Sequence, residues 1–155
     1  MLRRPLGSAL LRIGKASRHD ALHDAPLTAA QDLALAMKGI VESGCEAIFS
    51  LPNENLFFLL RKEITAAARQ HRIATMLGSR EAVRDGGLIA YAPNLLALYR
   101  RASYFVDRVL RGSHPGELPF EQPTRYDLVI NLATARALGI TIPERLLATV
   151  DEVID

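Results

Sequence analysis

The sequence predicts an α/β fold: one domain with a mostly parallel sheet covered by helices. Short apolar runs alternate regularly with amphipathic segments of helical period, and the links between them are short and rich in Gly, Asn and Pro. Repeated strand–helix units of this kind build parallel sheets. With 155 residues, of which 49% are hydrophobic, the chain is long enough for one domain with a real core.

The first helix is expected to follow Thr28. The segment 28–31 has the form of a capping box, and the next apolar residues recur at i, i+3, i+4, i+7 and i+8. These are Leu33, Ala36, Met37, Ile40 and Val41. Gly44 ends the helix, and Cys45 is expected to be a buried, inert thiol. The run 47–51 shows no alternation, which is typical of a strand buried on both faces.

A second helix is expected from residue 56, and the strand 73–77 follows it. The apolar face of this helix comprises Leu56, Leu59, Leu60, Ile64 and Ala67. Ser79 can cap a short helix that ends at Val83, and Gly86 and Gly87 break the chain before a strand at 88–91.

Asn94 is a good N-cap for the longest helix, 95–110. Its predicted buried face comprises Leu95, Leu98, Tyr99, Ala102, Val106, Val109 and Leu110. Three prolines and two glycines make 112–123 an irregular connection. A strand at 125–130 follows, then a short helix that Asn131 caps and Gly139 ends. Pro143 suits the first position of a last helix.

The first 27 residues are interpreted as a basic tail, loose or weakly helical, because Arg3, Arg4, Arg12, Lys15 and Arg18 precede any acid. Its apolar run is too short for an export signal. We therefore divide the chain into this tail (1–27), an α/β lobe (28–111), and a proline-rich link with a strand–helix segment of the same domain (112–155). The formal net charge of +2 gives no reason to expect a nucleic-acid partner.

Candidate binding residues follow the ends of the predicted strands. The carboxyl ends of parallel strands share one edge, and the helices that start there present unpaired N–H groups and a partial positive charge. The segments 52–55, 78–81 and 91–94 should meet at this edge, which suits a carboxylate. The candidates are Asn53, Glu54, Ser79, Arg80, Tyr91 and Asn94.

Each candidate also has a structural interpretation. Asn53 and Ser79 can cap helices, as Asn94 can, or contact a solute. Arg80 can hold a carboxylate by a bidentate pair of hydrogen bonds, or form a surface ion pair with Glu81 or Glu54. Tyr91 can stack on a planar solute or belong to the core, while Glu54 can pair with an α-amino group.

Other chemistries find little support. Gly86 and Gly87 belong to no complete phosphate-binding motif, and Ser79 lacks the residues of a hydrolase elbow. A single cysteine and four scattered histidines offer no zinc spacing. A receiver-type domain would need clustered acids after its first strand. We expect no enzyme, no cofactor and no metal.

A set of motifs from residue 28 to the end resembles one group of ABC-transporter substrate-binding proteins, those related to tryptophan/tyrosine-binding proteins. The motifs are Gly78-Ser79-Arg80-Glu81, Gly86-Gly87-Leu88-Ile89-Ala90-Tyr91-Ala92-Pro93-Asn94, Leu98-Tyr99-Arg100-Arg101-Ala102, Gln122-Pro123-Thr124, Leu128-Val129-Ile130-Asn131-Leu132, Ile142-Pro143 and Asp151-Glu152-Val153-Ile154. The resemblance implies a Rossmann-like, three-layer lobe of the type I periplasmic-binding-protein kind, of which only the C-terminal half is matched. It also implies that the three loops face a ligand.

The resemblance implies a role in binding a small solute, such as an amino acid, for an ABC permease. It implies a periplasmic location, although the sequence shows no signal peptide and a cytoplasmic one stays open. The alternative is a stand-alone Rossmann-like domain acting as a homodimeric interaction module. A homodimer is expected because the apolar faces of 95–110 and 126–130 would otherwise lack a partner.

Overall fold

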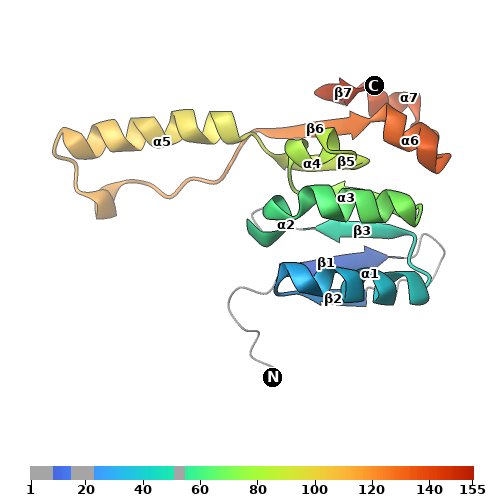
Figure 1. Cartoon of the computed structure of the whole chain (residues 1–155). Coiled ribbons are helices and arrows are strands. Elements are labelled where there is room, and N and C mark those ends of the chain that lie inside the picture. Colours follow the sequence, from blue (N-terminus) through green and yellow to red (C-terminus); the bar gives the residue numbers. More distant parts are fainter. Residues whose placement is uncertain (1–8, 15–22, 51–54) are drawn as a thin grey trace.

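The computed structural model describes residues 9–14, 23–50 and 55–155. Its sheet has the strand order β2-β1-β3-β4-β5-β6-β7 (Figure 1). The strands are β1 (Ala9–Gly14), β2 (His23–Leu27), β3 (Ala47–Ser50), β4 (Ala74–Leu77), β5 (Ile89–Pro93), β6 (Tyr126–Asn131) and β7 (Glu152–Ile154). Pairings β3–β4, β4–β5 and β6–β7 are parallel, whereas β1 runs antiparallel to β2 and β3, and β5 to β6. The predicted α/β class, with parallel strands at its centre, is confirmed.

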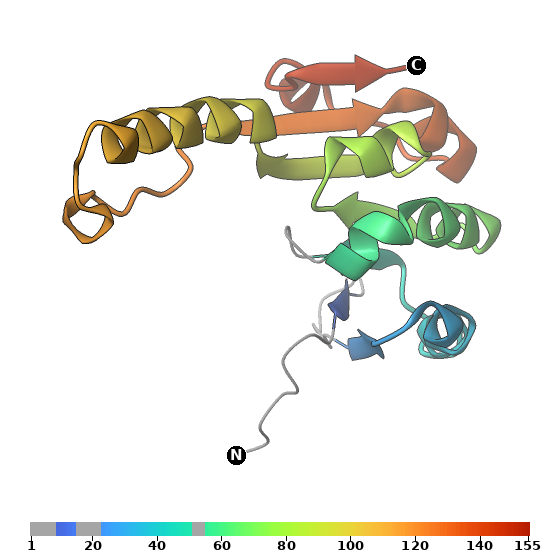
Figure 2. The same cartoon turned by 60° about the vertical axis from the view of Figure 1, so that its left-hand side comes forward.

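Helices α1, α3 and α4 lie side by side along the sheet (Figures 1 and 2). The helices are α1 (Leu33–Glu42), α2 (Asn55–Leu59), α3 (Arg61–Gln70), α4 (Arg80–Arg84), α5 (Leu95–Leu110), α6 (Leu132–Leu138) and α7 (Glu144–Leu147), with 3-10 turns η1 (Ala30–Asp32) and η2 (Pro115–Glu117). Burial alternates along β3, where Ile48 and Ser50 are buried and Ala47 and Phe49 only half-buried. The prediction that this run is buried on both faces was therefore wrong.

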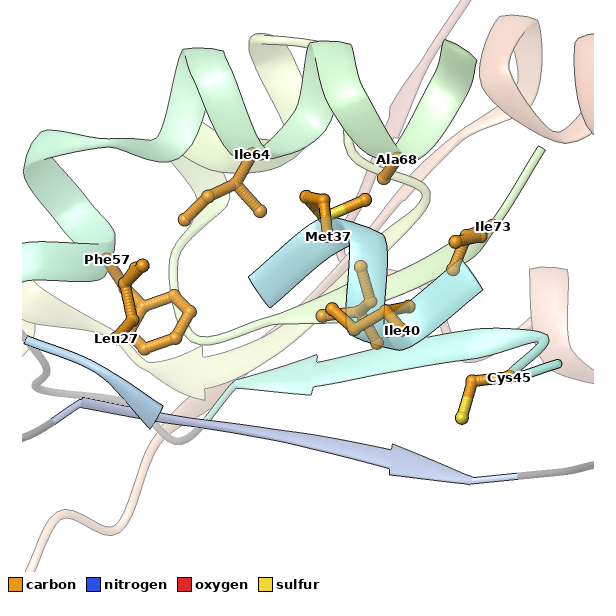
Figure 3. Close-up of a cluster of buried hydrophobic side chains, with 9 residues drawn as sticks. Leu27, Met37, Ile40, Cys45, Phe57, Ile64, Ala68 and Ile73 are labelled. Carbon is orange, nitrogen blue, oxygen red and sulfur yellow. The ribbon is translucent and has the colours of Figure 1, made fainter. Parts of the chain in front are cut away.

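The main core lies between α1, α2, α3 and the strands behind them (Figure 3). Its members are Leu27, Met37, Ile40, Cys45, Ile48, Phe57, Ile64, Ala68 and Ile73. Cys45 is buried, as predicted. A smaller cluster of Val83, Ala90 and Val129 ties α4 to β5 and β6. The strands that end at the candidate loops are thus packed against helices of the core.

The N-terminal segment differs from its prediction. Where a loose or weakly helical tail was expected, two parts of it form the antiparallel pair β1 and β2, and β1 also pairs with β3. Strand pairing is a non-local interaction, so local composition is a poor guide to it. The predicted division at residue 27 stays a prediction.

Two details of the first helices also differ. The N-cap is Ala29 rather than Thr28, and Asp32 rather than Gln31 stands at N3, where its Oδ2 accepts hydrogen bonds from the backbone N–H groups of Thr28 and Ala29. The hydrogen bond from the Thr28 hydroxyl has the largest effect on the pKa of Asp32, and together with the two backbone bonds it lowers that pKa. In the second helical segment, the predicted face is confirmed for Leu56, Leu60, Ile64 and Ala67, which belong to the core or pack against it. Leu59 is exposed instead, and Phe57 is buried.

The largest difference concerns α5. None of its sixteen residues is buried, although its sequence predicts a buried face. Figures 1 and 2 show α5 and the following segment projecting beyond the end of the sheet. After α5 and the segment that follows it, the chain comes back to the end of β5, since the Asn94 N–H donates to the Arg125 carbonyl (2.9 Å). Strand β6 therefore starts at the edge where β5 ends and runs antiparallel to it.

The predicted caps are mostly confirmed. The side chains of Ser79, Asn94 and Asn131 accept hydrogen bonds from backbone N–H groups three residues on. Gly139 ends α6 with φ +74°, a conformation that glycine adopts freely. Pro143 is the N-cap of α7 rather than its first residue.

Candidate functional site

A recess of about 300 Å³ opens at the carboxyl ends of β3, β4 and β5. Ser50 ends β3, Gly78 and Ser79 follow β4, and Pro93 ends β5. Helices α2 and α3 and the start of α5 supply further lining residues. The remaining lining residues are Asn55, Phe57, Phe58, Arg61, Ile64, Leu77, Ala82, Leu95 and Tyr99. The recess therefore lies at the sheet edge that the sequence indicates.

Two serine hydroxyls at this edge are held by the backbone. The Gly78 N–H donates to Ser50 Oγ (3.2 Å), and the Ala82 N–H donates to Ser79 Oγ (3.2 Å). Since each oxygen accepts from a backbone group, each hydroxyl keeps its own proton for an acceptor. Both side chains can thus donate to the oxygen of a solute.

Arg61 supplies the positive charge of the recess. Its Nε lies 2.7 Å from Asp85 Oδ2, its Nη1 donates to the Phe58 carbonyl (2.8 Å), and its guanidinium lies 4.6 Å from the centre of the Phe58 ring. Its side chain is only 25% exposed, so these contacts fix its orientation. Asp85 neutralises this guanidinium, so Arg61 offers a solute carboxylate its remaining N–H groups rather than a free charge.

A second recess of about 330 Å³ shares Pro93, Leu95 and Tyr99 with the first. Two predicted residues, Arg80 and Asn94, line it. Both polar ends of Asn94 are engaged: Oδ1 caps α5, and Nδ2 donates to Asp127 Oδ2 (2.7 Å). In this structure Asn94 has the capping role that its position allows.

Arg80 pairs not with Glu81 but with Glu152 on β7. Arg84 joins the same carboxylate, its Nη2 2.7 Å from Oε1. The hydrogen bonds from Arg84, then those from Arg80, hold the pKa of Glu152 below its usual range against the opposing effect of burial. This depressed pKa stabilises the fold above the ordinary glutamate range, and the contribution is lost as acid protonates Glu152.

The sequence prediction of the site is thus only partly matched by the recess. Ser79 lines the first recess, and Arg80 and Asn94 line its neighbour. Tyr91 lines neither and stacks on Tyr126, with ring centres 5.3 Å apart. Asn53 and Glu54 lie outside the described residues. Sequence reasoning placed Asn55 at this edge without choosing it as a candidate, and it missed Ser50, Phe57, Phe58, Arg61 and Tyr99 as lining residues. The end of a strand is a signal that could have found Ser50.

Within the described ranges, no group of three or more His, Cys, Asp or Glu side chains could hold a metal ion. Every helix in the same ranges falls short of the length and hydropathy of a membrane span.

Comparison with known protein families gives a match to the model for ABC transporter substrate binding proteins over residues 16–154. The chain belongs to this family. The predicted family is thus confirmed. A comparison with curated proteins finds no match.

Three solved structures resemble this substrate-binding family member. A conserved domain protein from Vibrio cholerae is 26% identical, with a TM-score of 0.75. The ABC domain in complex with L-Trp from Streptococcus pneumonia is 23% identical, with a TM-score of 0.74, and CD0873 from Clostridium difficile, a substrate binding protein with adhesive properties, is 17% identical, with a TM-score of 0.59. The matches cover 82%, 83% and 83% of this chain but only 42%, 44% and 42% of those chains. The last two show the fold alone.

Proposed function

We propose that this lobe binds an amino acid with an apolar, aromatic side chain in the recess at the ends of β3, β4 and β5, and serves an ABC permease. The observation that carries the proposal is that the wall of the recess has a polar part and an aromatic part. Arg61 and the hydroxyls of Ser50 and Ser79 are donors for a carboxylate, while Phe58 and Tyr99 offer aromatic surface. The L-Trp complex of a structure with the same fold supports this solute class.

In this arrangement the carboxylate of the solute lies against Arg61, and its side chain lies against the aromatic rings. Glu54 remains our proposed partner for the α-amino group, as the sequence suggests. Arg80, Tyr91, Asn53 and Asn94 stay proposals as further contacts. Arg80 would have to exchange its ion pair with Glu152 for the solute, whereas Ser79 needs no rearrangement.

The location outside the cytoplasmic membrane, and the permease as partner, are proposals that rest on the family. The alternative function, a homodimeric interaction module, is favoured by one observation: α5 carries an apolar face that no described residue buries. The two functions are compatible, because a dimer could form with the recess intact.

Replacing Arg61 with alanine is expected to weaken binding of L-tryptophan by about tenfold or more. A charge-assisted hydrogen bond contributes about 1.5–3 kcal/mol, and about 1.4 kcal/mol corresponds to a factor of ten. The chain contains four tyrosines but no tryptophan, so fluorescence of the added amino acid reports binding without a background from protein tryptophan. L-phenylalanine, leucine and glutamate as competitors would define the solute class.

Lys62→Ala is the matched control, because Lys62 is the next cation on α3, is exposed and does not line the recess. We expect it to leave the affinity unchanged. Circular dichroism must show that both variants are folded, since Arg61 also pairs with Asp85. Equal affinities in the wild type and Arg61→Ala would refute the role of Arg61, and no binding of any amino acid by the folded wild type would refute the proposed function.

A further inference from the structure

The start of β6 places a buried acid beside the second recess. Asp127 pairs with Ala92 of β5 in the antiparallel register, and both residues line that recess together with the start of α5. The side chain of Asp127 is only 11% exposed. A carboxylate at this depth has lost most of its contact with water, and its charge is costly unless a cation or several donors replace that water.

The partners of Asp127 replace this water only in part. Its Oδ2 accepts a hydrogen bond from Asn94 Nδ2 (2.7 Å), which is a neutral donor. Among the described residues, the one cation within ion-pair distance is Arg125, whose Nε lies 3.9 Å from Oδ1, beyond hydrogen-bond distance. The side chain of Arg125 is 70% exposed, so water screens this pair. Oδ1 therefore keeps its capacity to accept a hydrogen bond from a cation.

The rest of the wall suits a positively charged organic group. Arg80, the cation of this wall, is engaged by Glu152, and Glu81 adds a second carboxylate. Apart from Asn94 and Asp127, the other lining residues are apolar or aromatic: Ala92, Pro93, Leu95, Leu96 and Tyr99. Apolar walls reduce the screening of charge by water, and an aromatic ring adds attraction for a cation.

The second recess adjoins the first at Pro93, Leu95 and Tyr99, which line both. An amino acid carries its carboxylate and its ammonium group on the same α-carbon, so it can present them to two walls only where those walls meet. We propose that the second recess is the subsite for the ammonium group of the solute, with Asp127 Oδ1 as its acceptor. The inference rests on the proposed function, which puts the carboxylate in the first recess.

This assignment gives two of the predicted residues a defined relation to Asp127. Asn94 is a positioning residue, because its amide holds Oδ2 and leaves Oδ1 for the ligand. An ammonium group has three N–H donors, so Asp127 serves beside Glu54 rather than in its place. Asp127 then determines specificity, since it favours solutes with a charged amino group over analogues that lack one.

Two ligands test the subsite: L-tryptophan, and indole-3-propionate, which keeps the carboxylate but lacks the ammonium group. The fluorescence of the indole reports the binding of both. The wild type should bind L-tryptophan about tenfold or more tightly than indole-3-propionate. Asp127→Asn should remove most of this preference, because it weakens the binding of L-tryptophan by about the same factor and leaves that of indole-3-propionate no weaker.

Asparagine at position 127 keeps the shape of the side chain and an oxygen that can accept from Asn94, so the fold should persist, which circular dichroism checks. Asp107→Asn is the matched control. It makes the same change in α5, at a carboxylate that is 53% exposed and lines neither recess, and should leave both affinities unchanged.

The two ligands also separate the subsite from the proposed function. Equal affinities of the wild type for both ligands, or an equal loss of both in Asp127→Asn, would overturn the subsite and leave the proposed function in place. An equal loss would mean that Asp127 acts on the shape of the site and not on the ammonium group. Binding of neither ligand by the folded wild type would refute the proposed function and the subsite with it.

Discussion

Replacing Ile48 with alanine is expected to lower the free energy of unfolding by about 3 kcal/mol. Ile48 is fully buried in the middle of β3 and belongs to the main core cluster with Ile40 and Ile64. The shorter side chain loses the transfer free energy of its methyl and methylene groups and leaves a cavity that packed helices can fill only in part. The midpoint of urea unfolding measures this loss, with an unchanged slope.

Leu35→Ala is the control for this prediction. Leu35 lies on α1, which packs on the same core, but its own side chain is 74% exposed. We expect its effect to stay within about 0.5 kcal/mol. If Ile48→Ala destabilises the protein no more than Leu35→Ala does, the placement of β3 against α1 and α3 is incorrect. The base of the recess would then lose its support, since Ser50 lies two residues after Ile48 on the same face of the strand.

Replacing Asn131 with alanine is expected to cost about 2–3 kcal/mol, since it removes two buried hydrogen bonds. Asn131 Oδ1 accepts from the Thr134 N–H (2.8 Å), and its Nδ2 donates to the Val83 carbonyl (3.1 Å). The first bond caps α6 and the second joins β6 to α4. Without the side chain, a buried donor and a buried acceptor lose their partners.

Asn131→Ser separates these two contributions. Serine is as good an N-cap as asparagine, but it cannot replace the amide donor to Val83. We therefore expect a loss of about 1 kcal/mol, between those of the wild type and Asn131→Ala, by urea unfolding. Equal losses for Ser and Ala would mean that the cap contributes nothing, contrary to the geometry at Thr134.

The features that the sequence predicted well are local. Ser79, Asn94 and Asn131 each cap the helix that follows, because the hydrogen bond is formed within three residues. Strands β4 and β5 begin and end within one or two residues of their predicted positions. The reason is similar, because short apolar runs between turn residues can be recognised in the sequence without knowledge of the fold.

The features that the sequence could not give depend on partners distant along the chain. Arg80 was predicted to contact a solute or, as the structural alternative, to pair with Glu81 or Glu54. The ion pair that it forms is with Glu152, 72 residues away. The pattern of α5 predicts an apolar face but does not say which surface covers it. Arg61 was not among the predicted site residues, yet it lines the recess. For these reasons the edge that carries the site was predictable, whereas most of its wall was not.

The most direct test of the central claim, that a solute binds where β3, β4 and β5 end, is the mapping of backbone amide shifts by ¹H–¹⁵N NMR during titration with L-tryptophan. We predict saturable shifts concentrated at Ser50, Asn55, Arg61, Gly78 and Ser79, which line the recess. The absence of shifts in the folded protein, or shifts confined to the groove between α1 and α3 around Met37, Val41 and His71, would contradict the claim.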